Sequence, residues 1–130
     1  MSEVKKSDSI VGQKAYDFAI LIIQIYKELS SEKREFVLSK QLLRSGTSIG
    51  ANINEAISSE SKKDFVHKLS IALKESRETS YWLRLLSDSA FIEKDKFIIA
   101  SDNCNQLIKL LNSIILTTKE RYLKDALQTS

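Results

Sequence analysis

The chain has 130 residues, no proline, only three glycines and a formal net charge of +3 at pH 7. A chain of this length can bury its own core as one domain, and the scarcity of turn-forming residues excludes a hairpin-rich fold and favours long helices joined by short turns. The charge is only mildly basic, so it permits a nucleic-acid or acidic partner without requiring one.

The first helix is expected over residues 9–29, after a polar, disordered tail at residues 1–8. Its apolar seam alternates in steps of four and three residues, which is the period of a helix. Ala19, Ile23 and Tyr26 lie to one side of this seam, so the apolar stripe is wider than one neighbouring helix needs. The seam itself consists of Val11, Ala15, Phe18, Ile22, Ile25 and Leu29.

The second helix is expected over residues 32–58, with Ser31 as its cap because a serine oxygen can accept an N–H of the first turn. Gly46 and Gly50 fall on one side of this helix, and each glycine costs a helix about 1 kcal/mol relative to alanine. A partner helix in close approach offsets that cost, while a kink or break at these glycines is the open alternative. The expected core face is Leu38, Leu42, Ser45, Ile49, Ile53 and Ala56.

The third helix is expected over residues 62–87, behind a cap at Ser61. The fourth is expected over residues 95–124, with fraying over residues 125–130. The third helix has an inner row of Phe65, Leu69, Ala72, Ser76, Thr79, Leu83 and Leu86, flanked by Ile71, Glu75, Glu78, Trp82 and Leu85. The fourth has an inner row of Phe97, Ala100, Cys104, Leu107, Leu111, Ile114 and Thr118, and an outer row of Ile108, Ile115 and Tyr122.

Four long helices with short connections predict an all-α, antiparallel up-down four-helix bundle that forms one domain over residues 1–130. In such a bundle, further apolar rows lie outside the side chains that form the core and would be exposed in a monomer. Monomers rarely expose large apolar patches. We therefore expect a homo-oligomer. The expected interface residues are Ile71, Trp82, Leu85, Ile108, Ile115 and Tyr122.

A polar stripe on the second helix predicts a hydrogen-bonded network rather than an open active site. Glu78 stands in a row that is otherwise largely apolar, and an unpaired buried carboxylate is costly, so Arg44 or Asn52 is its expected partner. The predicted structural network consists of Arg44, Ser48, Asn52, Glu55 and Glu78.

Basic residues crowd the third helix, where they are candidate nucleic-acid contacts. Asp64, Glu75 and Glu78 lie among them, so an ordinary solvated helix face is the alternative interpretation. The candidate contacts are Lys62, Lys63, Lys68, Lys74, Arg77 and Arg84.

No catalytic residue, cofactor site or metal site is predicted. Asp64 and His67 have the spacing of half a di-metal site, but His67 is the chain's only histidine, which favours a surface histidine. Cys104 has no partner at ligand spacing and is expected to be a small buried hydrophobe. The longest apolar run, residues 19–23, is far shorter than the roughly 20 residues that span a bilayer, so a cytoplasmic protein without membrane contact is expected.

Three segments carry a family resemblance: RSGTSIGANINEA at residues 44–56, SKKDFVHKLSIALKE at 61–75 and RETSYWLRLL at 77–86. They resemble the bacterial four-helix-bundle proteins that are encoded in 23S rRNA intervening sequences, a family similar to the accessory protein of diversity-generating retroelements. The resemblance implies an up-down bundle, no known catalysis and, as in related members, a homopentamer. Many members carry proline where this chain has Gly50, and glycine where it has Ala56.

Two classes of function follow. The first is a non-catalytic assembly or adapter protein that associates with RNA, DNA or a nucleic-acid enzyme, because the retroelement relatives bind nucleic acid and a reverse transcriptase. The alternative is a cryptic ligand-binding protein or enzyme that uses the polar stripe of the second helix. We favour the first, with no small-molecule substrate, because no nucleophile–base pair or paired carboxylates stand out in the sequence.

Overall fold

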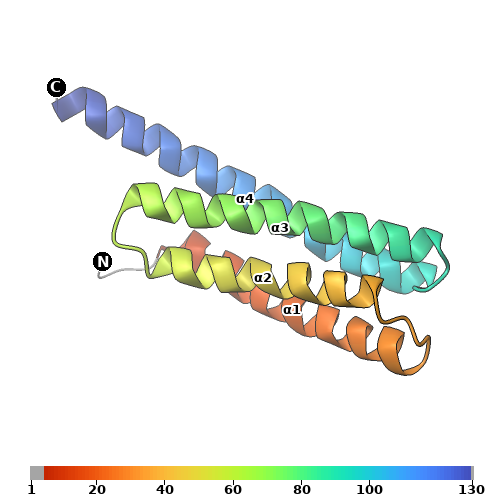
Figure 1. Cartoon of the computed structure of the whole chain (residues 1–130). Coiled ribbons are helices and arrows are strands. Elements are labelled where there is room, and N and C mark those ends of the chain that lie inside the picture. The colour runs from red at the N-terminus through yellow and green to blue at the C-terminus, as the bar shows by residue number, and fades with distance from the viewer. Residues whose placement is uncertain (1–4, 130) are drawn as a thin grey trace.

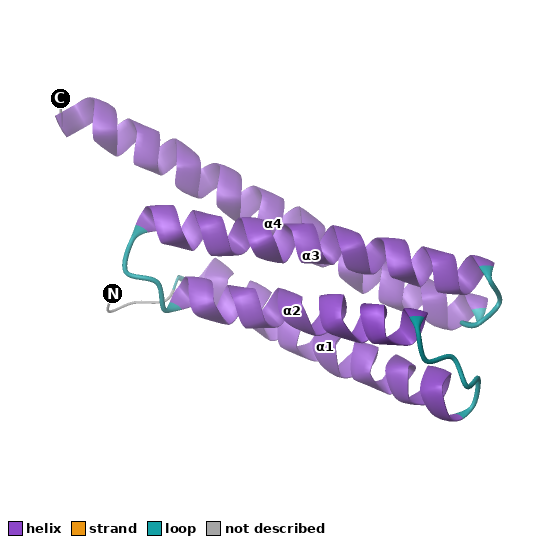
Figure 2. Cartoon of the chain, in the orientation of Figure 1, coloured by secondary structure: helices purple, strands orange, loops and turns teal. Residues whose placement is uncertain are grey.

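The structure is a computed structural model that describes residues 5–129. Within this range the chain forms four α-helices and no strand: α1 (Lys6–Ser31), α2 (Leu38–Ile57), α3 (Lys62–Asp88) and α4 (Lys94–Thr129) (Figure 2). Successive helices run antiparallel and pack side by side, and α4 returns to contact α1 (Figure 1). The predicted all-α, up-down bundle is therefore confirmed.

The ends of the bundle differ from the expected boundaries. Helix α1 begins at Lys6, so part of the expected tail is helical, while residues 1–4 lie outside the described residues. Helix α4 continues to Thr129, through the segment where fraying was expected. The C-terminal part of α4 extends past the rest of the bundle, and residues 119–128 are all exposed (Figure 1).

The second helix begins later than predicted, after an irregular connection between α1 and α2. Arg34 has a φ of 53°, a left-handed conformation that a right-handed helix cannot contain, and α2 begins only at Leu38. Ser31 is the last residue of α1 and does not cap α2, because its hydroxyl donates to the carbonyl of Lys27 within α1. The expected boundary was wrong because residues 32–37 contain no glycine or proline.

Glu35 takes the capping role that was expected of Ser31. Its carboxylate accepts N–H groups from Val37 at 3.2 Å, Leu38 at 3.1 Å and Ser39 at 2.7 Å. Burial raises the pKa of Glu35, but these backbone hydrogen bonds together outweigh that effect and leave the pKa below its ordinary value. At the next connection the predicted cap is confirmed, because Ser61 Oγ accepts the N–H of Asp64 at 3.0 Å.

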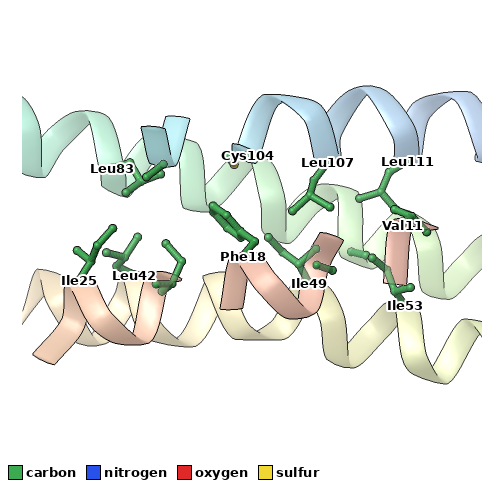
Figure 3. Close-up of a cluster of buried hydrophobic side chains, with 14 of the residues drawn as sticks. Val11, Phe18, Ile25, Leu42, Ile49, Ile53, Leu83, Cys104, Leu107 and Leu111 are labelled. Carbon is green, nitrogen blue, oxygen red and sulfur yellow. The ribbon is translucent and has the colours of Figure 1, made fainter. Parts of the chain in front are cut away.

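The core follows the predicted seams of all four helices. Every residue of the α1 seam is buried, and the inner rows of the other helices are buried except at Leu38, Phe65, Phe97 and Thr118, which are half-buried. Figure 3 shows side chains from all four helices meeting along the bundle axis. The residues labelled there are Val11, Phe18, Ile25, Leu42, Ile49, Ile53, Leu83, Cys104, Leu107 and Leu111.

Small polar side chains form one layer of this core. Thr79 donates its hydroxyl to Ser45 at 2.9 Å, which joins α2 and α3, and Cys104 Sγ lies 3.1 Å from the carbonyl oxygen of Ser76, which joins α4 and α3. Burial raises the pKa of the Cys104 thiol to about 12, so the thiol stays protonated at neutral pH. Cys104 is thus a small buried side chain, as expected.

The two glycines of α2 face α1, and α2 runs through both without a break. A Cβ at position 46 would lie 2.8 Å and 2.9 Å from the two γ-carbons of Ile22. A Cβ at position 50 would lie 3.6 Å from the nearest atoms of Ala15, an ordinary contact. Gly46 is therefore required by the close approach of α1, whereas Gly50 leaves room for a methyl group.

Replacement of these two glycines should have opposite effects on stability. Gly46→Ala should lower the free energy of unfolding by about 1–2 kcal/mol, since overpacking costs about 1–3 kcal/mol and outweighs the gain in helix propensity. Gly50→Ala should raise it by up to about 1 kcal/mol through propensity alone. Urea unfolding monitored by circular dichroism checks both, and equal effects of the two substitutions would contradict the assigned packing.

Candidate nucleic-acid interface

One face of α3 points away from the bundle and is mainly basic. Its residues recur in steps of four and three, so they share one side of the helix, and all of them are exposed. With a rise of 1.5 Å per residue the face spans about 30 Å. We call it the α3 outer row, and it consists of Lys63, His67, Ser70, Lys74, Arg77, Tyr81 and Arg84.

The structure separates the six candidate nucleic-acid contacts into two groups. Four of them belong to the α3 outer row: Lys63, Lys74, Arg77 and Arg84. Lys62 points elsewhere, because its Nζ donates to Asp125 of α4 at 2.8 Å. Lys68 is half-buried and lines a surface depression together with Asp64 and Glu55. Only the first group forms one continuous surface.

Two of the carboxylates that lay among these cations in the sequence, Glu75 and Glu78, lie beside the outer row, because each follows a basic residue by one position, or about 100°. Arg44 of α2 holds both glutamates, with Nη1 3.2 Å from Glu75 and Nη2 in contact with Glu78. Asp64 is exposed one position after Lys63, and Asp88 is an exposed carboxylate four residues after Arg84, where the row ends. No member of the α3 outer row itself, from Lys63 to Arg84, is a carboxylate.

An aromatic pair stands near the C-terminal end of the α3 outer row. Tyr81 is 49% exposed, and the guanidinium carbon of Arg84 lies 5.9 Å from the centre of its ring. The ring of Trp82 lies 5.1 Å from that of Tyr81 at an interplanar angle of 70°, and its Nε1 donates to Glu78 at 3.0 Å. Tyr81 was not among the predicted site residues, although its spacing from Arg77 and Arg84 places it in the same row.

The predicted polar network is smaller and less buried than expected. Arg44 and Glu78 are in contact, but their side chains are 50% and 33% exposed. Ser48 donates to the carbonyl of Arg44 and Asn52 to that of Ser48, so both bond within α2. Glu55 is exposed, and its carboxylate takes part in none of the side-chain hydrogen bonds or ion pairs within residues 5–129. The polar side chains of α2 thus do not point toward one position, whereas those of a small-ligand binding site do.

The expected interface residues are largely covered by their own chain. Ile115 is buried and Ile108 packs against the core, so the outer row expected on α4 mostly serves the bundle itself. Ile71, Trp82 and Leu85 are half-buried, and only Tyr122, at 56%, is well exposed. Large exposed apolar side chains occur instead at Ile10, Tyr16, Ile20 and Ile23 on α1, and at Ile98, Ile99, Leu116, Leu123 and Leu127 on α4.

A cavity of about 330 Å³ lies between the start of α1, the start of α3 and the second half of α4. Its wall is mostly apolar around Phe65 and Ile114, and Asp8 and Arg121 contribute charges of opposite sign. Burial raises the pKa of the Asp8 carboxyl above its ordinary value. Within the described residues, no group of three histidine, cysteine or acidic side chains could hold a metal ion, and no helix is long and apolar enough to cross a membrane.

Loss of the Glu78 carboxylate should have a small effect on stability and a clear effect on Trp82. Glu78→Ala should lower the free energy of unfolding by less than about 1 kcal/mol, because ion pairs this exposed contribute little. It should shift the fluorescence of Trp82, whose N–H loses its acceptor. Glu55→Ala removes an equally charged side chain and should change neither quantity. A loss of several kcal/mol in urea unfolding would show that the pair is buried in solution.

Comparison with known proteins agrees with this architecture. The family model described as 23S rRNA-intervening sequence protein matches residues 7–113. A solved structure of a protein of unknown function from the S23 ribosomal protein family, from Bacteroides thetaiotaomicron, is similar with a TM-score of 0.83 and 49% sequence identity, over 84% of this chain and 97% of that one. Comparison with curated proteins gave no match. The chain therefore belongs to the family of 23S rRNA-intervening sequence proteins.

Proposed function

We propose that this protein is a non-catalytic, homo-oligomeric RNA-binding protein that holds RNA along the α3 outer row. The observation that carries the proposal is the alignment of four exposed cations on one helix face, beside which Arg44 pairs with Glu75 and Glu78. RNA is the nucleic acid we select, because the family is named for an intervening sequence of 23S rRNA. Such a protein would act as an assembly or adapter factor in the cytoplasm.

The chemistry of the α3 outer row suits phosphate groups. Lysine and arginine bind phosphate oxygens by charge-assisted hydrogen bonds, and arginine can do so with two parallel bonds. Tyr81 adds a hydroxyl donor for phosphate or ribose oxygens on the same exposed side. A straight helix carries these groups, so the contacts are set along a line of about 30 Å before RNA binds. This arrangement favours binding to the backbone over reading of a base sequence.

Exposed apolar side chains support the homo-oligomeric part of the proposal. Tyr16, Ile20 and Ile23 follow one another by four and three residues and form a ridge on α1. Leu123 and Leu127 lie on one side of the part of α4 that extends past the bundle. Burial of such faces between copies would remove them from water, and a closed ring would prevent fibres. The resemblance to related family members suggests five copies.

Oligomerisation would also strengthen RNA binding. Each subunit contributes one α3 outer row, and a ring places several of these rows within reach of one RNA molecule. Contacts made after the first are intramolecular, which raises the overall affinity without any new kind of contact. A modest charge of four cations in one row is then sufficient for stable binding.

Reversal of two central cations tests the RNA-binding surface. Lys74→Glu/Arg77→Glu should abolish binding of structured RNA at moderate salt while helical content is retained. For the wild type, the logarithm of affinity should fall with the logarithm of salt concentration with a slope of about −3 to −4 per subunit, because each neutralised phosphate contributes about 0.7–0.9. Titration by fluorescence anisotropy at several salt concentrations measures both.

A matched control is available outside α3. Lys27→Glu/Lys40→Glu makes the same charge change at two exposed positions of α1 and α2, and it should weaken binding only slightly. Equal losses for the two double variants would show that net charge, rather than the α3 outer row, determines binding. Failure of the wild-type protein to bind any RNA at low salt would refute the proposed function.

The oligomeric state can be measured directly. Light scattering coupled to size exclusion should give a mass near five times the 14.8 kDa of one chain. Ile20→Lys should yield smaller species, because a charge in the α1 ridge cannot be buried without cost. Val37→Lys places the same charge on an exposed apolar residue of the α1–α2 connection and should leave the mass unchanged. A wild-type mass of one chain would contradict oligomerisation, and a different multiple would contradict only the number five.

A further inference from the structure

We infer that Tyr81 is a stacking site for one unpaired base, so that the RNA preferred by this protein is a duplex stem that continues into a single strand. The inference rests on the proposed function, because it concerns what the α3 outer row binds. The stem would lie along the row from Lys63 to Arg77, and the first unpaired nucleotide would meet Tyr81. Three features of the row support this assignment.

The first feature is the surroundings of Tyr81. Half of its surface is exposed although the ring is already in contact with Arg84 and Trp82. The position of Trp82 is in turn held by its hydrogen bond to Glu78. An aromatic ring that is held on some sides and open on another is suited to stack on a base, and such stacking tolerates any base sequence. The adjacent guanidinium can contribute a cation–π contact or hold the phosphate of the same nucleotide.

The second feature is the lack of further stacking sites at close spacing in the row. Proteins that bind single strands offer aromatic side chains to successive bases. The only other ring in the α3 outer row is that of His67, which lies fourteen residues before Tyr81, or about 21 Å along the helix. Successive bases of one strand cannot stack on rings this far apart. The row between Lys63 and Arg77 is therefore suited to phosphates, which a duplex presents while its bases are stacked inside.

The third feature is the position of Tyr81 relative to the cations. Arg77 lies one turn before it and Arg84 about one turn after it. A backbone that follows the row therefore has a phosphate contact on each side of the stacking site. This order places the base-binding residue at one end of the surface, where a stem would give way to a single strand.

The experiment compares two duplex RNAs with the wild-type protein: a blunt duplex, and the same duplex with a single-stranded overhang of a few nucleotides. A free single strand is titrated in parallel. The overhang should tighten binding about tenfold, within the range that one base–aromatic stack contributes. Tyr81→Leu keeps an apolar contact for Trp82 but removes the ring, so it should bind both RNAs with the affinity of the blunt duplex. Tyr81→Phe should keep the preference, and so should His67→Ala, which removes the other ring of the row.

Trp82 supplies a second readout that does not depend on a variant. It is the only tryptophan in the chain, and its ring centre is 5.1 Å from that of Tyr81. The overhang RNA should therefore change the fluorescence of Trp82 in the wild-type protein more than the blunt duplex does. Circular dichroism and the melting temperature show whether Tyr81→Leu is folded. If the variant is unfolded, the fluorescence of wild-type Trp82 with the two RNAs still tests whether a base stacks on Tyr81.

Each outcome has a clear meaning. Equal affinities of the wild type for the two RNAs, or a preference that survives Tyr81→Leu, would overturn the stacking site. A free single strand that binds as tightly as the overhang duplex would overturn the assignment of the stem. If both RNAs bind alike and Lys74→Glu/Arg77→Glu still abolishes binding, this inference fails while the proposed function stands. If no RNA binds at low salt, both fail.

Discussion

The structure depends on the close contact between Gly46 of α2 and Ile22 of α1. Because Gly46 has no side chain, the side chain of Ile22 packs directly against the backbone of α2. On its other side α2 reaches α3 through the buried Ser45–Thr79 hydrogen bond. The glycine lowers the intrinsic helix stability of α2 by about 1 kcal/mol. The packing that it permits offsets this cost, and α2 remains one continuous helix.

The position of α2 also determines the charge distribution on α3. With α2 in place, Arg44 spans the α2–α3 boundary and pairs with Glu75 and Glu78. These pairs are too exposed to contribute much stability. Their effect on the surface is larger, because the guanidinium compensates part of the acidic charge beside the outer row, whose cations extend over about 30 Å. A chain with a net charge of only +3 thus presents four exposed cations on one side of a helix, which supports the proposed binding of RNA.

Sequence periodicity was sufficient to predict the four helices, their buried seams, the cap at Ser61 and the glycine face, because each of these depends on residues close together in the chain. It failed at the start of α2, since the left-handed conformation of Arg34 is not marked by glycine, asparagine or proline. It could not separate packing within the chain from packing between copies at Ile108 and Ile115, because an apolar row has the same spacing whether its neighbour is in the same chain or in another. Tyr81 was not among the predicted RNA contacts, because those were chosen by their positive charge and an aromatic side chain on the same face carries none.

Protection of lysines from chemical acetylation tests the central claim most directly, since it locates bound RNA on the unmodified protein. If RNA lies along the α3 outer row, saturating structured RNA should slow the acetylation of Lys63 and Lys74 several-fold, as measured by mass spectrometry. Lys27 of α1 and Lys40 of α2, which are also exposed, should react at the rate of the free protein. Equal protection of all four lysines, or protection of Lys27 and Lys40 alone, would contradict the assignment of α3 as the RNA-binding helix.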